Sequence, residues 1–168
     1  MDQIIRRARC RCGKVVCEAA GPPILTAMCY CGDCQAGGRM IEARNGAGPV
    51  LEADGGASYL AYRDDRFRCV AGAELLQGIK LRDKAPTQRF VATCCNSAMY
   101  LKFKPGHWVS TYRNRFEEGA LPPVEMRTNI RKRQSDLPLP QDAPAYRRFP
   151  MRLFGRLIKA RLDMALGR

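Results

Sequence analysis

The sequence predicts a mainly β fold made of small antiparallel sheets, with one helix at the C-terminal end. Two observations support the sheets: short stretches with strand-like residue patterns recur over residues 13–103, and glycine-containing turns separate them. A third observation supports the helix, because charged side chains recur at helical spacing over residues 151–166. The length of 168 residues and the 46% hydrophobic content are typical of one globular domain with a real core.

The predicted strands follow one another closely along the chain. Residues 13–31 are expected to form two strands around Gly21-Pro22-Pro23, and the second covers residues 24–28. The glycines of residues 35–49, Gly37-Gly38 among them, predict a loop with a short extended piece near residues 40–41. Further strands are expected at residues 58–62, 67–71, 74–81, 89–93 and 98–103.

The C-terminal third of the chain differs in composition from the rest. We expect residues 1–125 to form the β domain, residues 126–150 a linker or strap rich in proline and arginine, and residues 151–168 a basic amphipathic helix. The polar side chains of that helix form one narrow stripe, so most of its surface must be buried against the domain or against a second copy in a homodimer. The stripe consists of Arg152, Arg156, Lys159 and Asp163.

The chain is strongly basic, and the charge is unevenly distributed. The net charge is +13, and residues 101–168 alone carry 15 Lys and Arg against 6 Asp and Glu. This excess predicts either a solubilising surface or a region that binds an acidic partner, such as nucleic acid or a membrane surface. Residues 1–7 lack the apolar segment of a secretory signal, and no stretch approaches the roughly 20 apolar residues of a membrane span. We therefore expect a reducing, cytoplasmic location.

Seven of the nine cysteines lie in three tight clusters whose spacing is typical of metal ligands. In a reducing compartment such clusters bind metal more often than they form disulfides. Tetrahedral zinc takes thiolates at about 2.3 Å, and cysteines a few residues apart on a glycine-containing turn can aim their sulfurs at one point. The clusters are Cys10-Arg11-Cys12-Gly13, Cys29-Tyr30-Cys31-Gly32-Asp33-Cys34 and Cys94-Cys95.

The number of clustered thiols indicates two sites of different kinds. Seven thiols fit one closed four-thiolate site and one three-thiolate site, and an open fourth position is typical of catalytic zinc. The other two cysteines, Cys17 and Cys69, lie in apolar strand patterns and are expected to be small core residues. Redox sensing by the adjacent pair Cys94-Cys95 is a weaker alternative, because bound zinc would protect these thiols from oxidation.

Taken in order, the three clusters resemble the motifs of the glutathione-dependent formaldehyde-activating enzyme (GFA) superfamily. Cys10-x-Cys12-Gly13-x-Val15 resembles its first motif, and Cys29-x-Cys31-x-x-Cys34-Gln35 resembles its central motif. Residues 89–100, which contain Cys94-Cys95, resemble its third motif, an aromatic-rich stretch that leads into C-x-x-C-G-[ST]-P-[LI]. The resemblance covers residues 8–105 and implies a tent-like arrangement of small antiparallel sheets around zinc.

The resemblance also implies which cysteines bind zinc. The first and third motifs would jointly hold a structural zinc, and the central motif would hold a second zinc whose open position faces the substrate cleft. The structural ligands would be Cys10, Cys12, Cys95 and the substitute Cys94, and the catalytic triplet would be Cys29, Cys31 and Cys34.

The chain departs from the family pattern in its third motif. Ala92 stands where another cysteine is expected, and the neighbouring Cys94 is the obvious substitute, provided that a turn brings both adjacent thiols to one side. Asn96 replaces the motif's glycine, and asparagine tolerates the left-handed backbone that glycine would adopt. These changes are typical of a divergent branch of the superfamily.

Two hypotheses of function follow. The first is a zinc-dependent carbon–sulfur lyase in which the triplet activates a small thiol, as in the family reaction of glutathione with formaldehyde to S-hydroxymethylglutathione. The second is a non-catalytic zinc module that binds nucleic acid or a protein through the basic C-terminal part. The only histidine, His107, is expected at the surface or at a strand end, or else as an acid–base group or zinc ligand in the cleft. Asp33 is expected to cap the turn after Gly32 or to orient a water at the zinc.

Overall fold

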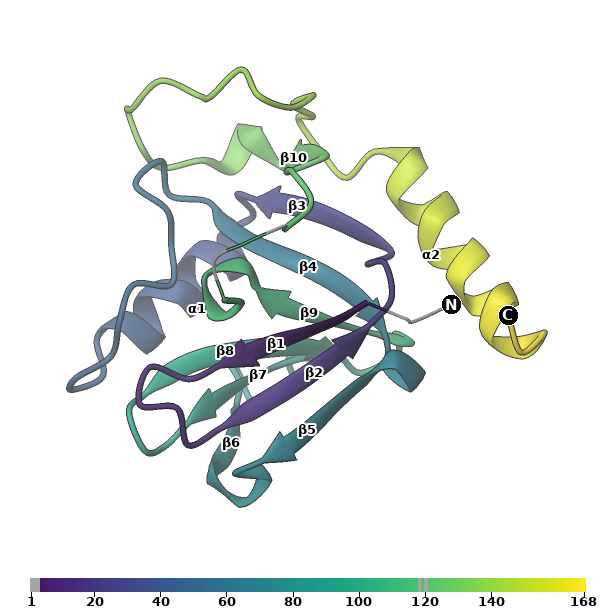
Figure 1. Cartoon of the computed structure of the whole chain (residues 1–168). Coiled ribbons are helices and arrows are strands. Elements are labelled where there is room, and N and C mark those ends of the chain that lie inside the picture. The colour runs from purple at the N-terminus through teal and green to yellow at the C-terminus, as the bar shows by residue number, and fades with distance from the viewer. Residues whose placement is uncertain (1–3, 118, 120) are drawn as a thin grey trace.

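Two β-sheets of unequal size form the framework of the computed structural model, which describes residues 4–117, 119 and 121–168 (Figure 1). Residues 1–3 of the N-terminal stretch therefore lie outside the described residues. The smaller sheet has the order β1-β2-β5, and the larger has the order β10-β3-β4-β9-β8-β7-β6. The strands are β1 (Ile5–Arg9), β2 (Val16–Ala20), β3 (Leu25–Cys29), β4 (Ala57–Arg63), β5 (Phe67–Ala71), β6 (Leu76–Ile79), β7 (Thr87–Ala92), β8 (Ser97–Phe103), β9 (Trp108–Tyr112) and β10 (Met126–Thr128).

The mainly β fold with a C-terminal helix is confirmed, and the larger sheet is mixed. Most neighbouring strands pair antiparallel, but β10 joins β3 in parallel, from Met126 beside Ala27 to Thr128 beside Cys29. β10 lies at the start of the segment expected to be a linker or strap, and β1 and β9 are further strands that the sequence patterns missed. The parallel pairing places the chain after β10 next to the C-terminal end of β3.

The expected loop at residues 35–49 is wrong in its first part, because helix α1 covers Gly32–Glu42. Gly37-Gly38 concealed this helix, since a glycine inside a helix costs up to about 1 kcal/mol relative to alanine. Packing explains both glycines: a Cβ on Gly37 would lie 2.1 Å from Nε of Arg89, and one on Gly38 would lie 2.5 Å from Cδ2 of Leu51. Both positions therefore suit glycine because of close approach, in spite of its low helix propensity.

β10 and the segment after it pack against α1 and the loop before β4 through hydrogen bonds that are largely buried. The Arg127 guanidinium is 3% exposed and binds the Tyr30 hydroxyl, the Asp54 carboxylate at 3.0 Å and the Asp142 carboxylate at 2.8 Å. Arg133 donates to the backbone carbonyl of Asp54 at 3.1 Å. Part of the basic charge in this segment therefore stabilises the fold.

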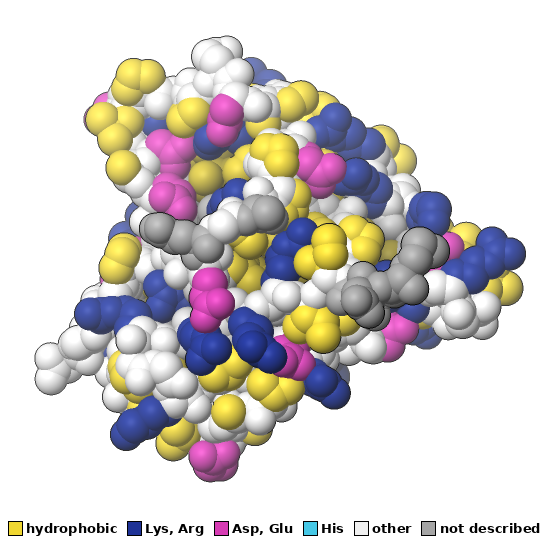
Figure 2. Space-filling model, viewed as in Figure 1, with side chains coloured by type: hydrophobic (Ala, Val, Ile, Leu, Met, Phe, Trp, Pro, Cys, Tyr) yellow, Lys and Arg dark blue, Asp and Glu magenta, His cyan; other side chains and the backbone are white. Residues whose placement is uncertain are grey.

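Basic side chains are dispersed on the face seen in Figure 2. Lys and Arg side chains on this face alternate with acidic and hydrophobic ones and form no continuous patch there. A phosphate backbone is bound best by clustered basic residues along one groove or face. The face shown therefore adds no support to the nucleic-acid hypothesis.

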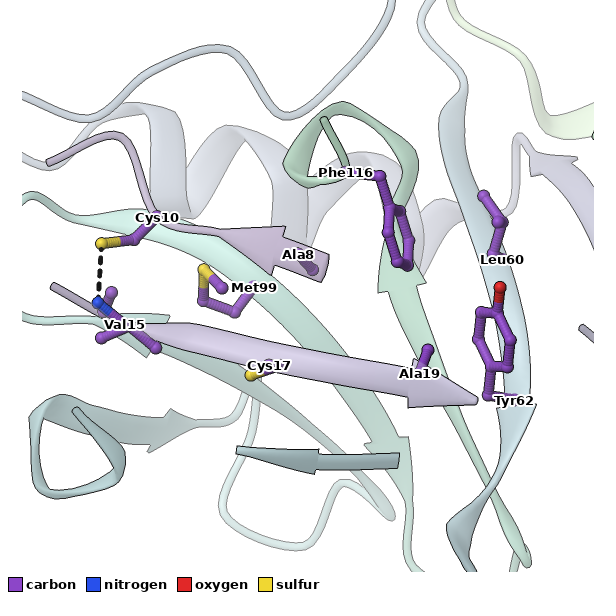
Figure 3. Close-up of a cluster of buried hydrophobic side chains, with 10 residues drawn as sticks. Ala8, Cys10, Val15, Cys17, Ala19, Leu60, Tyr62, Met99 and Phe116 are labelled. Atoms are coloured by element: carbon purple, nitrogen blue, oxygen red, sulfur yellow. Dashed lines mark hydrogen bonds between the residues drawn. The ribbon is translucent and has the colours of Figure 1, made fainter. Parts of the chain in front are cut away.

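The core between the two sheets contains Cys17, as expected from its apolar strand pattern (Figure 3). Cys17 is fully buried, and burial raises the pKa of its thiol. Cys69 lies opposite it on β5 and packs against the same cluster while remaining half-buried. Neither cysteine belongs to the groups of sulfurs described below. The other side chains of this core are Ala8, Cys10, Val15, Ala19, Leu60, Tyr62, Ala92, Met99 and Phe116.

The C-terminal helix α2 (Met151–Ala165) is confirmed, and it docks on the larger sheet. Leu153 and Leu157 pack against residues of β3, β4 and β10. Polar contacts fix the helix near both ends: Arg152 donates to the backbone carbonyl of Glu125 at 2.6 Å, and Arg63 donates to the backbone carbonyl of Arg168. Among the described residues, no helix combines the length and the apolar character that crossing a membrane requires.

Substitution of two adjacent residues tests how α2 docks. Leu157 is 8% exposed and Ile158 is 61% exposed. We expect Leu157→Ala to lower the free energy of unfolding by about 2–5 kcal/mol, because it leaves a cavity in the core. We expect Ile158→Ala to change it by less than about 0.5 kcal/mol. Urea denaturation measures both, and equal losses would contradict this orientation of the helix.

Candidate metal centres

The tips of two hairpins bring four cysteine sulfurs together. Cys10 and Cys12 lie in the turn between β1 and β2, and Cys94 and Cys95 lie in the turn between β7 and β8. The sulfur of Cys94 lies 3.8 Å from that of Cys10 and 3.3 Å from that of Cys12, and all four sulfurs are within 4.8 Å of one another. Zinc–sulfur bonds of about 2.3 Å in a tetrahedron separate the sulfurs by about 3.8 Å. The group therefore fits one metal ion.

The local backbone explains why the first hairpin tip presents its thiols. Gly13, directly after Cys12, has a φ of +79°, which lets the chain turn back toward β2. The backbone N–H of Val15 donates to the sulfur of Cys10 at 3.2 Å (Figure 3). Such a bond stabilises a thiolate and leaves the sulfur free to bind a cation on its other side.

At the second tip, a turn brings the two adjacent thiols to one side. Cys94 reaches the cluster directly, whereas Ala92 is fully buried at the end of β7. Asn96 has a φ of 51°, so it adopts the left-handed conformation that was expected at this position. Burial raises the pKa of Cys95, but hydrogen bonds from Ser97 and from the backbone outweigh it and lower the pKa to about 6. This thiol is therefore largely ionised at neutral pH.

The second group of sulfurs lies where β3 passes into α1. Cys29 ends β3, Cys31 is the N-cap of α1, and Cys34 is in its first turn. The three sulfurs lie within 4.8 Å of one another. The backbone N–H of Cys34 donates to the sulfur of Cys31 at 3.3 Å, and the positive end of the helix dipole favours thiolates at this position. The C-x-x-C spacing therefore places both thiols at the N-terminal end of α1, one at the N-cap and one in the first turn.

The thiols of this triplet influence one another strongly. Hydrogen bonds from Cys31 and Cys34 lower the pKa of Cys29 well below its usual value. Hydrogen bonds with Cys29 and Cys31 raise the pKa of Cys34 well above its usual value, because a neighbouring thiolate disfavours a second negative charge. The side-chain amide of Asn129 adds a long contact of 3.7 Å to the sulfur of Cys29. A bound cation would remove the repulsion and let all three thiols ionise.

Two further residues of this site were not identified from the sequence. Arg89 is 1% exposed and donates from Nη2 to the backbone carbonyl of Asp33 at 2.6 Å, and its Nε has no hydrogen-bond partner among the described residues. Tyr59 stands beside the triplet, and burial, followed by the nearby Cys29, raises its pKa, so its hydroxyl stays protonated. Arg89 could have been identified as a buried charged residue, because it falls on the inward face of a strand with an alternating pattern.

The triplet forms part of the wall of a cavity of about 730 Å³. The rest of the wall is mainly hydrophobic and comes from β3, β4, the β8–β9 hairpin and α2. This volume lies in the range of sites for small organic molecules. The four-cysteine group does not contribute to this wall. The two groups thus differ in setting: one joins two hairpin tips, and the other faces a space that a ligand can enter.

His107 and Asp33 have structural contacts in this region. His107 lines the cavity, and its Nε2 lies 2.7 Å from the backbone carbonyl of Leu157, so it ties the β8–β9 hairpin to α2. It does not belong to either group of sulfurs. Asp33 lies in the first turn of α1 and pairs with Arg82 at 3.2 Å. The expected turn cap at Asp33 is therefore wrong. Asp33 is a carboxylate in the first turn, and the sulfur of Cys31 caps the helix.

Comparison with known proteins gave a structural match and no sequence family. No protein-family model matches the chain, and no curated protein matches it. Among solved structures, the crystal structure of a Rhodobacter sphaeroides protein, a structural-genomics target, is 17% identical to it. The match covers 69% of this chain and 91% of that chain, with a TM-score of 0.47.

Two helical glycines should respond oppositely to alanine. A Cβ on Gly37 would collide with the Arg89 guanidinium, so we expect Gly37→Ala to lower the free energy of unfolding by about 1–3 kcal/mol. Gly155 in α2 has open space around it, so Gly155→Ala should raise that free energy by up to about 1 kcal/mol. Thermal and urea denaturation measure both variants. A stabilising Gly37→Ala would contradict the close contact between α1 and Arg89.

Metal content should depend on the clustered cysteines alone. We expect about two zinc equivalents per chain in the purified protein and about one in Cys12→Ser, because Cys12 is an exposed member of the four-cysteine group. Cys69→Ser is the matched control and should keep both. Elemental analysis provides the measurement. A Cys12→Ser protein with the zinc content of the control would remove Cys12 from the ligand set.

Proposed function

We propose that this chain is a zinc-dependent enzyme of the carbon–sulfur lyase type, which makes or breaks the adduct of a small thiol, such as glutathione, with a carbonyl compound. One observation carries the proposal: three thiols at metal-binding separation form part of the wall of a cavity. Three protein ligands are one fewer than tetrahedral zinc requires, which leaves a position for a substrate. The resemblance of the three cysteine motifs to the GFA superfamily points to the same chemistry.

The residues of the site have separate roles in this proposal. Cys29, Cys31 and Cys34 would hold the zinc, which, when bound, lowers the pKa of a coordinated thiol. The N-terminal amides of α1 stabilise the negative charge on the protein sulfurs, and the buried Arg89 guanidinium holds the first turn of α1 through the backbone carbonyl of Asp33. The Tyr59 hydroxyl is a hydrogen-bond donor at the edge of the triplet. The apolar wall offers few hydrogen-bond partners to a water that would compete for the open position.

The reaction balances without a further reactant. The sulfur of the thiol attacks the carbonyl carbon, a carbon–sulfur bond forms, and the electron pair of the C=O π bond moves to oxygen. The proton that leaves the thiol ends on that oxygen, so the product is a hydroxyalkyl thioether. The reverse sequence cleaves the same carbon–sulfur bond and is the lyase direction.

The four-cysteine group has a structural role in this proposal. Cys10, Cys12, Cys94 and Cys95 would complete a closed tetrahedron and leave no position for a substrate. Because two of these ligands belong to the smaller sheet and two to the larger, a zinc ion there would fasten the sheets together. Free thiols of this kind persist in a reducing compartment, so we place the protein in the cytoplasm.

Thiol binding that depends on Cys31 tests the function. We expect the zinc-loaded wild type to bind 2-mercaptoethanol or glutathione and Cys31→Ser to bind at least roughly tenfold more weakly, because the triplet loses a ligand. Cys69→Ser is the control, since Cys69 has similar exposure and lies outside both groups. Isothermal titration calorimetry measures the affinities. Equal affinity of the wild type and Cys31→Ser for both thiols would refute the function.

A further inference from the structure

The wall of the cavity is too apolar for a hydrophilic ligand. Leu25 of β3, Leu101 and Phe103 of β8, and Trp108 of β9 contribute large hydrophobic surfaces. Glutathione carries two carboxylates and an ammonium group, and each of these groups needs a polar partner when it leaves water. A cavity with this lining favours a ligand whose body is hydrophobic.

Several polar groups that line the cavity already have partners, but Arg161 of α2 also lines it and forms no hydrogen bond or ion pair with the described residues. Arg89 donates to the backbone carbonyl of Asp33, and the Asp33 carboxylate pairs with Arg82. The imidazole of His107 is bound to the backbone carbonyl of Leu157. Arg161 could pair with one carboxylate, but the second carboxylate and the ammonium group of glutathione would have to displace protein contacts of Arg89, Asp33 or His107, which reduces the net gain.

Helix α2 presents a second apolar row to the same cavity. Leu153 and Leu157 are buried in the core, but Phe154, Ile158 and Leu162 are 44%, 61% and 57% exposed and line the cavity. Their spacing of four residues places them on one face of the helix, over about 12 Å of its length. Large side chains left open in this way gain free energy when an apolar molecule covers them.

We propose that the thiol bound at the Cys29, Cys31 and Cys34 site carries an apolar body, an alkyl or aryl chain that lies along α2 against Phe154, Ile158 and Leu162. This inference rests on the proposed function, because it assumes that the sulfur of the ligand meets the triplet. It refines that function by replacing glutathione with a hydrophobic thiol. The sulfur end would be selected by the triplet, and the chain would be selected by the helix.

A series of thiols tests the proposal with the full, zinc-loaded protein. Trp108 is the only tryptophan and lines the cavity, so its fluorescence reports entry of a ligand, and calorimetry gives the affinities. From ethanethiol through butanethiol to hexanethiol, we expect binding to tighten about fourfold for each added methylene. We expect hexanethiol to bind more tightly than glutathione and more tightly than hexanol, which lacks the sulfur.

Two variants of α2 separate the chain from the sulfur. Ile158→Gln should reduce the gain per methylene and leave the affinity for ethanethiol unchanged. Leu166→Gln is the matched control, because Leu166 is 63% exposed but does not line the cavity, and it should behave as the wild type. Both side chains are exposed, so neither change should unfold the protein.

The outcomes distinguish this proposal from the function on which it rests. An affinity that does not change with chain length, or tighter binding of glutathione than of hexanethiol, would overturn the apolar ligand and leave Cys31-dependent thiol binding intact. Absence of binding by every thiol, or equal binding of hexanol and hexanethiol, would overturn both. If Ile158→Gln instead dissociated a dimer and left the thiol series unchanged, a second copy would cover this row, and the proposal would fall.

Discussion

Mutual repulsion among crowded thiolates is the constraint around which this fold is built. Two unit charges 4 Å apart repel by about 4 kcal/mol at an effective dielectric constant of 20. Seven sulfurs held within 4.8 Å of their neighbours can ionise together only beside a cation. The opposite pKa shifts of Cys29 and Cys34 express this constraint, since one thiolate suppresses the ionisation of the next. A divalent ion at each group would attract the thiolates and so offset their mutual repulsion.

The two groups of sulfurs apply that cohesion in different places. The four-cysteine group joins the tips of two hairpins that belong to different sheets, so its metal would cross-link these sheets beside the core that they share. The triplet joins the end of β3 to the start of α1. The Arg89 side chain packs against Gly37 of that helix and donates to the backbone carbonyl of Asp33. Because α2 and the β8–β9 hairpin complete the cavity around the triplet, the site that faces this cavity depends on elements far apart in the chain.

The sequence predicted those parts of the fold and site that have a local signal. The cysteine spacings predicted both groups of sulfurs, the turn signals located most strands, and the polar stripe located α2. Helix α1 was missed because Gly37-Gly38 serves contacts with Arg89 and Leu51, which lie far from it in sequence. The role of Arg89 and the apolar cavity could not be read locally either, because they arise only when β3, β8 and α2 come together. The pairing of β10 with β3 is a long-range parallel contact of the same kind.

X-ray absorption at the zinc edge of the purified protein tests the central claim most directly, because it counts the sulfurs around the metal. A closed site with four sulfurs and an open site with three give a mean of about 3.5 sulfurs per zinc at about 2.3 Å, with a lighter atom making up the remainder. Addition of a thiol ligand should raise that mean to about four, as the open position is filled by sulfur. A mean of four sulfurs before any thiol is added, unchanged afterwards, would show that no open thiolate site exists and would contradict the account.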